Sequence, residues 1–383
     1  MTIEECRLKS ERASSSLVAF FLWHPSIAGA RLALWDIAEH YKHHIPPRLR
    51  ELFPHVAFSI ARPRARDLRH LKEILEHRIM ILAIELTNIC NANCRFCAYR
   101  HQRRPKGIMS SELFEYAIHQ YAEAGGGMLN LTPIVGDPLV HASLVSRIKF
   151  AKQIKQITYI FLYTNLIGLD SFDPRDVLSS GLDRIAISTS IGSKETYART
   201  FGVDRYDSVM RNLETLLGEN RRLNDPVKVT VHVRADKPHE QITSSPVYRR
   251  ILRQYGRAVC HIDDQYDNWT GLIEEDDLPR HHAFPHLQNM SEPCAELYNG
   301  MIVFLNGDVG ICWRRDLEAK LVVGNIRDSS LKDIWRGERV RTIREQWVEG
   351  NIPTICRKCY CYTPLSRFMV YSGSRILSMQ QVR

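Results

Sequence analysis

Three cysteines follow an apolar run at residues 79–84: Cys90, Cys94 and Cys97. Intervals of three and two residues let a single loop wrap three thiolates around a compact inorganic core. A tetrahedral zinc site would need a fourth ligand nearby, and this part of the sequence offers only His101. A four-iron cubane held by three thiolates keeps one iron open, which can chelate a substrate or cofactor through nitrogen and oxygen. The spacing therefore indicates a catalytic iron–sulfur centre.

The three-cysteine motif has an aromatic residue, Phe96, before its last cysteine, and it resembles the signature of the radical S-adenosylmethionine (radical SAM) enzymes. The resemblance implies a [4Fe–4S] cluster whose open iron binds the amino and carboxylate groups of S-adenosylmethionine. It also implies an external one-electron reductant of the flavodoxin or ferredoxin type. Reductive cleavage of the cofactor would give a 5′-deoxyadenosyl radical that abstracts hydrogen from a substrate. The alternative is a cysteine-rich zinc knuckle.

Length, composition and charge indicate an ordinary cytoplasmic protein. A chain of 383 residues, 44% apolar and 25% charged, is long enough to divide into two or three units. Its apolar run at 17–23 is far shorter than the roughly 20 residues that cross a bilayer, so we expect neither a membrane anchor nor a signal peptide. Ten cysteines in metal-like spacings indicate a reducing compartment. The net charge of +9 is interleaved with acidic residues, so we expect no nucleic-acid partner.

From residue 79 onward, strand-like and helix-like patterns alternate, which predicts an α/β fold with a parallel sheet. The predicted strands cover residues 79–86, 128–135, 157–163, 184–189, 227–234 and 259–264, with helices between them, for example at 111–123, 141–155 and 206–217. The family resemblance implies that residues 79–285 form a partial (β/α)6 TIM-like radical SAM barrel. We expect an N-terminal helical segment at 1–78 and a C-terminal cluster-binding extension at 286–383.

Polar residues at successive strand ends match positions that touch the cofactor in the radical SAM family. Gly136-Asp137-Pro138 stands where relatives usually have Gly-Gly-Glu-Pro, so the first of the two glycines is missing. Loops at the C-terminal strand ends carry the chemistry in barrels, so we expect these residues to lie together. The resemblance implies that the cofactor also contacts Phe96, Asn165, Ser188, Ser190 and Arg234. Read without the resemblance, each is an ordinary turn or strand-end residue.

A second cysteine group lies near the C-terminus. Its opening, Cys294, Gly307 and Cys312, resembles that of the SPASM extension of radical SAM enzymes. The resemblance implies an auxiliary cluster, and the simplest four-thiolate set for one [4Fe–4S] cluster is Cys294, Cys312, Cys356 and Cys359, with Cys361 left over. Such a cluster would exchange electrons with the substrate radical or help to fold the extension. Zinc in the same four ligands is the alternative.

The substrate stays open at this point. A small polar metabolite, such as a sugar or aminocyclitol, would undergo oxidation or epimerisation, with Cys260 and Cys361 as candidate hydrogen-atom donors. The alternative is a peptide substrate, as in the radical SAM maturases of ribosomally synthesised peptides (RiPP type). Such enzymes often carry a strand-containing module that binds the leader peptide, and the sequence before residue 78 shows no pattern of that kind. A non-catalytic iron–sulfur or electron-transfer protein is a third hypothesis. Residues 263–271 fit a polyol contact or a solvated linker, and the basic run at 100–106 fits a substrate-anion contact or a surface loop.

Overall fold

The computed structural model describes residues 65–132, 134–234, 237–255, 259–263, 266–278 and 289–369. Residues 1–64 of the predicted N-terminal helical segment lie outside these ranges, and helix α5 (Ala65–His77) is the described part of that segment. The chain forms two compact units, residues 1–76 with 363–383 and residues 77–362. The elements and sites below belong to the second unit. None of the described helices is long and apolar enough to cross a bilayer.

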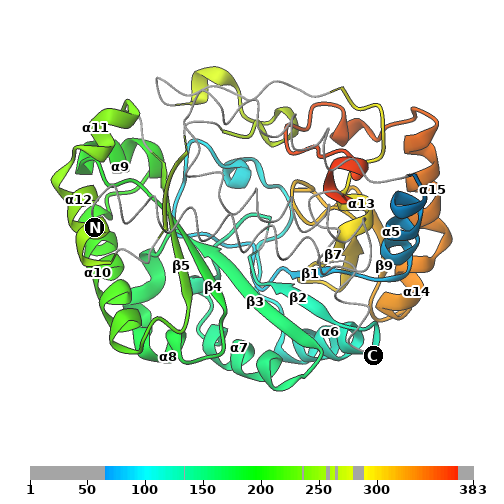
Figure 1. Ribbon diagram of the computed structural model, residues 1–383, viewed down its shortest axis with the longest axis horizontal. Coiled ribbons are helices and arrows are strands. Elements are labelled where there is room, and N and C mark those ends of the chain that lie inside the picture. The colour runs from blue at the N-terminus through cyan, green and yellow to red at the C-terminus, as the bar shows by residue number, and fades with distance from the viewer. Residues whose placement is uncertain are drawn as a thin grey trace, which may run out of the picture. The chain divides into compact units, whose positions relative to one another are not determined.

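A parallel sheet forms the frame of the second unit, as the alternating pattern predicted. Its first six strands are β1 (Ile81–Ile84), β2 (Gly127–Asn130), β3 (Ile157–Thr164), β4 (Arg184–Thr189), β5 (Lys228–Arg234) and β6 (Val259–Asp263). Strands that follow one another in the chain are neighbours in the sheet and run parallel. The strands fan out with helices along one side, which confirms the expected open partial barrel (Figure 1). Their C-terminal ends therefore meet at one edge.

Helices connect these strands. They are α6 (Ser111–Glu123), α7 (Leu144–Gln153), α8 (Pro174–Leu178), α9 (Lys194–Phe201), α10 (Tyr206–Arg222), α11 (His239–Thr243) and α12 (Pro246–Gln254). The Ser110 hydroxyl caps α6 by accepting the Leu113 N–H at 3.2 Å, and Gly202 ends α9 in the left-handed conformation. The helix predicted at 111–123 is confirmed, while that predicted at 141–155 is shorter.

Short 3-10 helices lie in the connecting loops: η2 (Ala98–His101), η3 (Pro138–Val140), η4 (Ile167–Ser171), η5 (Trp269–Gly271), η6 (Glu275–Asp277) and η7 (Thr354–Cys356). Most of them occur where a strand has ended and the chain turns back. Because a 3-10 turn is tight, it lets a loop change direction within a few residues. These turns shape the loops that carry the candidate site residues.

The C-terminal extension continues the same sheet. Strand β7 (Gly300–Val303) pairs parallel to β1, and β8 (Asp308–Gly310) and β9 (Val322–Asn325) follow in antiparallel order. The described residues thus form a nine-stranded sheet in the order β6-β5-β4-β3-β2-β1-β7-β8-β9. Three helices complete the extension: α13 (Glu296–Asn299), α14 (Leu331–Arg336) and α15 (Glu338–Val348). The sequence pattern did not predict the pairing of β7 with β1.

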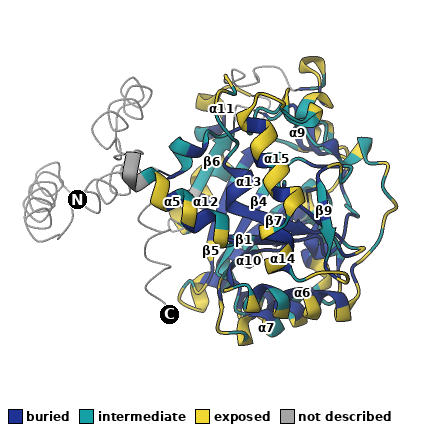
Figure 2. Ribbon diagram, turned by 90° about the vertical axis from the view of Figure 1, so that its right-hand side faces the viewer, coloured by how far each residue is buried: buried dark blue, intermediate teal, exposed yellow. Residues whose placement is uncertain are grey.

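The two faces of the strands differ in polarity. Because side chains alternate along a strand, Val229, Val231 and Val233 of β5 share one face, and Val229 packs near Leu217 of α10. This helix-covered face is the buried apolar core, seen as dark blue strands in Figure 2. The inner face, on the other side, carries polar side chains in the same strands: Arg184, Ser188, Thr230, His232, Arg234, His261 and Asp263.

Gly300, at the start of β7, lies where this strand of the extension packs closely on β1. Its φ of −170° is ordinary extended backbone, but a β-carbon there would lie 2.3 Å from the Ile81 carbonyl oxygen. We therefore expect Gly300→Ala to lower the free energy of unfolding by about 1–3 kcal/mol through overpacking. Thermal or denaturant unfolding measures this change.

Gly218 provides the matched control. It lies inside α10, where the nearest atom to an added β-carbon is the Tyr255 hydroxyl at 3.9 Å. Alanine is the better helix former, so Gly218→Ala should leave stability unchanged or raise it by up to about 1 kcal/mol. Equal stability of Gly300→Ala and the unmodified protein would contradict the tight pairing of β1 and β7.

Candidate active site

The loop that carries the first three cysteines leaves β1 and closes on itself through paired side-chain and backbone contacts. The Asn88 amide donates to the Pro105 carbonyl at 2.9 Å, and its oxygen accepts the Gly107 N–H at 2.8 Å. The Thr87 hydroxyl also donates to the Gly107 carbonyl at 2.9 Å. A closed neck of this kind fixes where the loop begins and ends. We call residues 85–107 the cluster loop.

The tip of the cluster loop is held by the C-terminal end of α9. Backbone N–H groups of Asn93 and Arg95 donate to the carbonyls of Phe201 and Thr200, each at 3.0 Å. Gly202 follows with φ +70°, and a β-carbon there would lie 2.3 Å from the Asn93 carbonyl oxygen. A glycine is thus required for the loop to approach the helix so closely. The cysteines lie between two fixed points.

The three cysteines of the cluster loop form a buried donor set. Burial raises the pKa of the Cys90 thiol to about 12, and burial also raises the pKa values of Cys94 and Cys97. A thiolate at Cys97 or Cys90 would raise the pKa of Cys94 further, so the three sulfurs lie near one another. None of the nine cysteines in the described ranges forms a disulfide bond. Crowded buried thiolates need a cationic core, and the residues therefore fit a three-thiolate iron–sulfur cluster.

The turn Gly136-Asp137-Pro138 packs directly on the cluster loop. Gly136 has φ +105°, and a β-carbon there would lie 2.8 Å from the Thr87 carbonyl oxygen. The Asp137 N–H donates to the Ile89 carbonyl at 3.0 Å. The glycine that this chain keeps from the family pattern is therefore one that the backbone geometry requires.

The Asp137 carboxylate turns into the protein and joins the ends of β2 and β3. It accepts the backbone N–H groups of Leu139 at 2.9 Å and Asn165 at 2.7 Å, and also the Thr164 hydroxyl. Burial raises the pKa of Asp137, and the two N–H donors oppose that rise. The Asn165 amide in turn donates to Asn91 at 2.8 Å, within the cluster loop. Asn91 had not been singled out from the sequence, although it directly follows Cys90.

Arg234, at the end of β5, lies beside the cluster loop. Its Nε donates to the Ser188 hydroxyl at 3.3 Å, and its Nη1 lies 3.2 Å from an Asp263 carboxylate oxygen. These partners place the guanidinium 5.4 Å from the centre of the Phe96 ring and 5.5 Å from that of Tyr266. The structure thus brings the predicted residues Arg234, Ser188 and Phe96 together, through an aspartate that had not been expected.

Ser190 and Cys260 are placed very differently. The Ser190 hydroxyl, just beyond β4, is fully buried, and within the described residues it has no hydrogen-bond partner. A buried hydroxyl without a partner is costly, so Ser190 is well suited to contact a bound group. Cys260 lies on the face of β6 opposite His261 and Asp263, and near Tyr248 of α12. It therefore faces away from the predicted cofactor residues.

The second cysteine group assembles from three stretches of the extension. Cys359 follows a tight turn in which its N–H donates to the Cys356 carbonyl at 3.0 Å. Burial raises the pKa values of both thiols, and charges on Cys312 and Cys294 raise them further. The four sulfurs are therefore neighbours, which fits a four-thiolate metal centre. Within the described ranges, no three Cys, His, Asp or Glu side chains are already arranged as a metal-ion site, so the four thiols would have to adjust on binding a metal centre.

Cys361 lies close to that set, since its charge raises the pKa of Cys359, and its thiol has a partner of its own. Its thiol donates to the carboxylate of Asp267, which also accepts the Arg315 Nε–H at 2.8 Å. Burial raises the pKa of Cys361 to about 11, and the positive charge of Arg315 opposes that rise. Asp267 and Arg315 were not predicted as site residues.

Within residues 266–271, Tyr266 and Trp269 pack against the cluster loop, so a solvated linker does not describe these two residues. Tyr266 is only 3% exposed and packs on Phe96, with ring centres 5.2 Å apart. The Trp269 indole N–H donates to the Phe96 carbonyl at 3.0 Å. The two aromatic residues were the sequence feature that indicated packing against the protein. The many acidic residues around them favoured the interpretation as a solvated linker instead.

One arginine of the basic run after the cysteines, Arg104, points into the protein, while Arg100, Arg103 and Lys106 are exposed. Arg104 forms an ion pair with the fully buried Glu85, Nη1 to Oε2 at 3.0 Å, and its Nε donates to the Leu317 carbonyl at 2.7 Å. Glu85 also accepts the Leu305 N–H at 3.2 Å. Neither a surface loop nor a substrate-anion contact describes Arg104. Its side chain joins the cluster loop to the extension.

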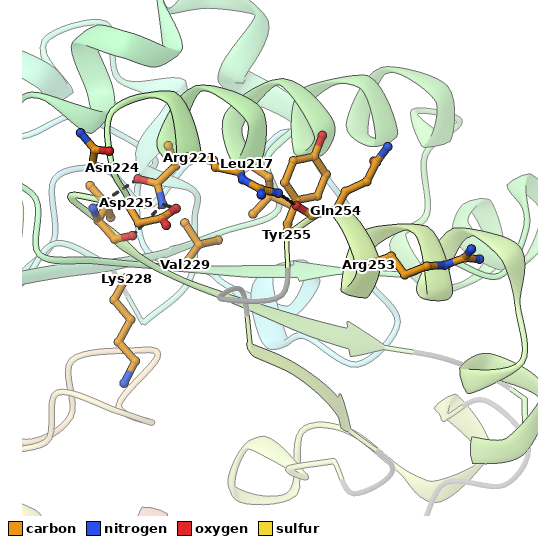
Figure 3. A pocket seen from close by; sticks show the side chains of 11 residues that line it. Leu217, Arg221, Asn224, Asp225, Lys228, Val229, Arg253, Gln254 and Tyr255 are labelled. Carbon is orange, nitrogen blue, oxygen red and sulfur yellow. Dashed lines mark hydrogen bonds between the residues drawn. The ribbon is translucent and has the colours of Figure 1, made fainter. Parts of the chain in front are cut away.

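A cavity of about 610 Å³ lies elsewhere, where β5 begins and α10 and α12 end (Figure 3). The cluster loop leaves the C-terminal end of β1, and the strands are parallel, so the cavity is at the opposite edge of the sheet. Its lining residues include Asn220, Arg221, Asp225, Lys228 and Tyr255. None of the candidate site residues contributes to it.

Two protein-family models match the chain, and together they cover both cysteine groups. The radical SAM superfamily model matches residues 84–232, which include the cluster loop and the strand-end residues up to β5. A second model, SPASM, an iron–sulfur cluster-binding domain, matches residues 294–360.

Curated relatives match the chain over different lengths. A GTP 3′,8-cyclase of Chlorobaculum tepidum is 26% identical over 237 residues, which are 60% of this chain and 69% of that protein. A probable GTP 3′,8-cyclase of Saccharolobus islandicus is 29% identical over 138 residues, 36% of this chain and 43% of that protein. The chain thus spans less than half the length of the Saccharolobus relatives.

A solved structure shares the fold. Streptococcus suis SuiB, bound to its precursor peptide SuiA, aligns with a TM-score of 0.52 at 15% identity, over 75% of this chain and 71% of SuiB. At that identity the likeness concerns the fold alone. Radical SAM proteins use a [4Fe–4S] cluster with S-adenosylmethionine, and SPASM domains bind auxiliary iron–sulfur clusters. The chain belongs to the radical SAM superfamily and carries a C-terminal SPASM domain.

Proposed function

We propose that this radical SAM enzyme abstracts hydrogen from a small polar metabolite in an oxidation or epimerisation. The observation that carries the proposal is the polar inner face of strands β3 to β6, whose C-terminal end lies beside the cluster loop. Ligand sites in barrels lie at this end of the strands, and specificity comes from a few convergent polar groups. Membership of the radical SAM superfamily implies the radical chemistry, and the polar inner face indicates the class of substrate.

Aromatic, imidazole and guanidinium groups follow one another along this inner face. Tyr163 is 39% exposed, and the Arg184 guanidinium lies 5.7 Å from the centre of its ring. Arg184 also donates to the Thr230 hydroxyl at 3.4 Å. The rings of His232 and His261 stack with centres 5.2 Å apart. Such a surface suits hydroxyl and anionic groups of a small molecule better than apolar side chains of a peptide.

His232 has the arrangement of a hydrogen-bonding or proton-accepting group. Its Nδ1 lies 3.2 Å from an Asp263 carboxylate oxygen, which favours the tautomer with hydrogen on Nδ1. Burial raises the pKa of Asp263, but hydrogen bonding from His232 and the charge of Arg234 outweigh it and hold the carboxylate ionised. The Nε2 atom is enclosed and has no protein partner among the described residues. A substrate hydroxyl would supply one.

The names of the curated relatives agree with this substrate class. Those proteins are named for action on GTP, a small polar metabolite with an anionic group. The inner face carries two arginines and two histidines against the single carboxylate of Asp263. We therefore propose a substrate that combines hydroxyl groups with polar or anionic substituents, as sugars, aminocyclitols and nucleotides do.

We propose that Cys90, Cys94 and Cys97 hold the cluster that binds S-adenosylmethionine. Bound together, the cluster and cofactor supply reductive cleavage and a hydrogen-abstracting radical, with the electron from an external flavodoxin- or ferredoxin-type protein. The chain positions these groups. The Asn165 amide lies 3.6 Å from the Cys90 sulfur, and hydrogen bonds to ligating sulfurs tune such centres.

The cofactor's polar end would meet the residues gathered around the cluster loop. We propose contacts from the turn at 136–138, Asn165, Ser188, Ser190 and Arg234. The turn offers backbone groups, because the Asp137 side chain is occupied by its own hydrogen bonds. Ser190 offers its buried hydroxyl, which lacks a partner in the described part of the chain. Arg234 offers a fixed positive charge beside Phe96.

The second group, Cys294, Cys312, Cys356 and Cys359, is proposed to hold one auxiliary [4Fe–4S] cluster. Four thiolates leave no open iron, so a role in electron exchange or in folding fits better than substrate binding. Cys361 is not needed to complete this set, and its thiol donates a hydrogen bond to Asp267. Because Cys260 faces the helices, an epimerisation would use Cys361 as the hydrogen donor.

The first test removes the proposed cofactor cluster. Changing Cys90, Cys94 and Cys97 together to Ala should abolish formation of 5′-deoxyadenosine from S-adenosylmethionine under reducing conditions. Cys260→Ala is the matched control and should keep that activity, because Cys260 lies on the outer face of β6. Product is quantified by chromatography with anaerobic, reconstituted protein. Retained cleavage in the triple variant would refute the assignment, and no cleavage by the unmodified protein would favour a non-catalytic carrier.

The second test counts iron. Reconstituted protein should hold about eight irons per chain, from two four-iron clusters, and the triple variant should hold about four. Substitution of Cys356 and Cys359 should remove the other four and destabilise the extension, since ligation and folding are coupled. Stoichiometric zinc in protein purified without air or reconstitution, with iron confined to the first site, would show a structural zinc clip instead.

The third test concerns the inner face. Candidate sugars, aminocyclitols and nucleotides are screened for stimulation of 5′-deoxyadenosine formation, with deuterium transfer from labelled compound to the product as the readout. His232→Gln should reduce the stimulated rate roughly 10- to 100-fold, as expected for the loss of one buried hydrogen bond at about 1–3 kcal/mol. Stimulation and deuterium transfer from peptides alone would refute the small-metabolite proposal and favour a peptide maturase.

A further inference from the structure

One guanidinium lies between the two cysteine groups. Arg315 comes shortly after Cys312, and its side chain is 20% exposed. Its Nε donates to an Asp267 oxygen at 2.8 Å, and its Nη1 donates to the Arg314 carbonyl at 2.7 Å. These bonds fix both the position and the orientation of the charge. A fixed buried charge acts over several ångströms with little screening.

Toward the cluster loop, Arg315 acts through Trp269. The guanidinium lies 4.3 Å from the centre of the indole ring, and the indole N–H donates to the Phe96 carbonyl at 3.0 Å. Cys97 is the next residue and packs in the same cluster of side chains as Trp269. Burial raises the pKa of Cys97, and the charge of Arg315 opposes that rise, which agrees with their proximity.

Toward the second group, Arg315 acts together with Asp267. The same Asp267 oxygen that accepts from Arg315 also accepts the Cys361 thiol. Burial raises the pKa of Cys359, and the negative charge of Asp267 adds to that rise. The Arg315 guanidinium thus contacts side chains that adjoin both cysteine groups, and the Asp267 carboxylate paired with it accepts from Cys361 beside the second group.

We propose that the Arg315–Asp267 pair is a shared electrostatic control that sets the reduction potentials of both clusters. The inference rests on the proposed function, which assigns a cluster to each cysteine group. Reduction adds negative charge to a cluster, so a nearby cation raises its potential and a nearby anion lowers it. Within the pair, the charge of each side chain partly cancels the electrostatic effect of the other on the clusters. Removing one charge should therefore leave the effect of the other uncompensated at both clusters.

The experiment compares Arg315→Gln, Asp267→Asn and the double variant with the unmodified protein. Midpoint potentials are measured by redox titration followed by electron paramagnetic resonance. The two signals are assigned with the variants that lack either cysteine group. We expect Arg315→Gln to lower both potentials and Asp267→Asn to raise both, with the double variant closer to the unmodified protein than either single change.

Two further variants separate charge from structure. Arg315→Lys keeps the positive charge and should shift both potentials less than Arg315→Gln. Arg314 pairs with Glu296 at 3.1 Å and opposes the thiol pKa rise of Cys361 by its charge, so Arg314→Gln should shift the second potential while leaving the first unchanged. Iron content and melting temperature are recorded for every variant. Loss of iron in Arg315→Gln would leave Asp267→Asn as the decisive variant.

Each result decides the question. Shifts of opposite sign in the two single variants, at both clusters, support the shared control. Shifts of the same sign, or a shift at one cluster alone with normal iron content, overturn it. If iron counting finds zinc in the second site, the cluster assignment itself has failed, and the shared control fails with it.

Discussion

A buried ion pair between Glu85 and Arg104 holds together the parts on which the site depends. Glu85 directly follows the first strand, and Arg104 lies nineteen residues later, near the end of the cluster loop. The same two side chains bind backbone groups of Leu305 and Leu317 in the extension. Leaving one member of a buried pair unpaired costs about 3–5 kcal/mol, whereas exposed pairs contribute about 1 kcal/mol or less. This ion pair therefore ties the cluster loop to the extension.

A second buried carboxylate fixes the loops that follow strands β2 and β3. The Asp137 carboxylate is nearly fully buried and accepts hydrogen bonds from Leu139, Thr164 and Asn165. Asn165 then reaches the cluster loop through Asn91. Buried polar groups of this kind are stable only when their hydrogen bonds are satisfied, so they specify one arrangement of the loops around them. Rigid strand ends thus present the cysteines and their polar neighbours in a fixed geometry.

Local chemistry was predictable from the sequence, and long-range partners were not. Cysteine spacing and strand-end positions are local features, so they identified the cluster loop and the polar residues around it. The partner of Arg234 was missed, because the position of Asp263 depends on how β5 and β6 pair. The pairing of β7 with β1 was missed for the same reason, since Gly300 carries no local sign of a strand more than 200 residues away.

The central claim is that the open iron at the cluster loop binds S-adenosylmethionine. Electron–nuclear double resonance, with the cofactor labelled with nitrogen-15 at its amino group, tests it directly. The protein is reduced after Cys356 and Cys359 have been changed to Ala, so that one cluster remains. The account predicts hyperfine coupling between that cluster and the labelled nitrogen. Absence of the coupling at full iron and cofactor occupancy, or the same coupling after loss of Cys90, Cys94 and Cys97, would contradict it.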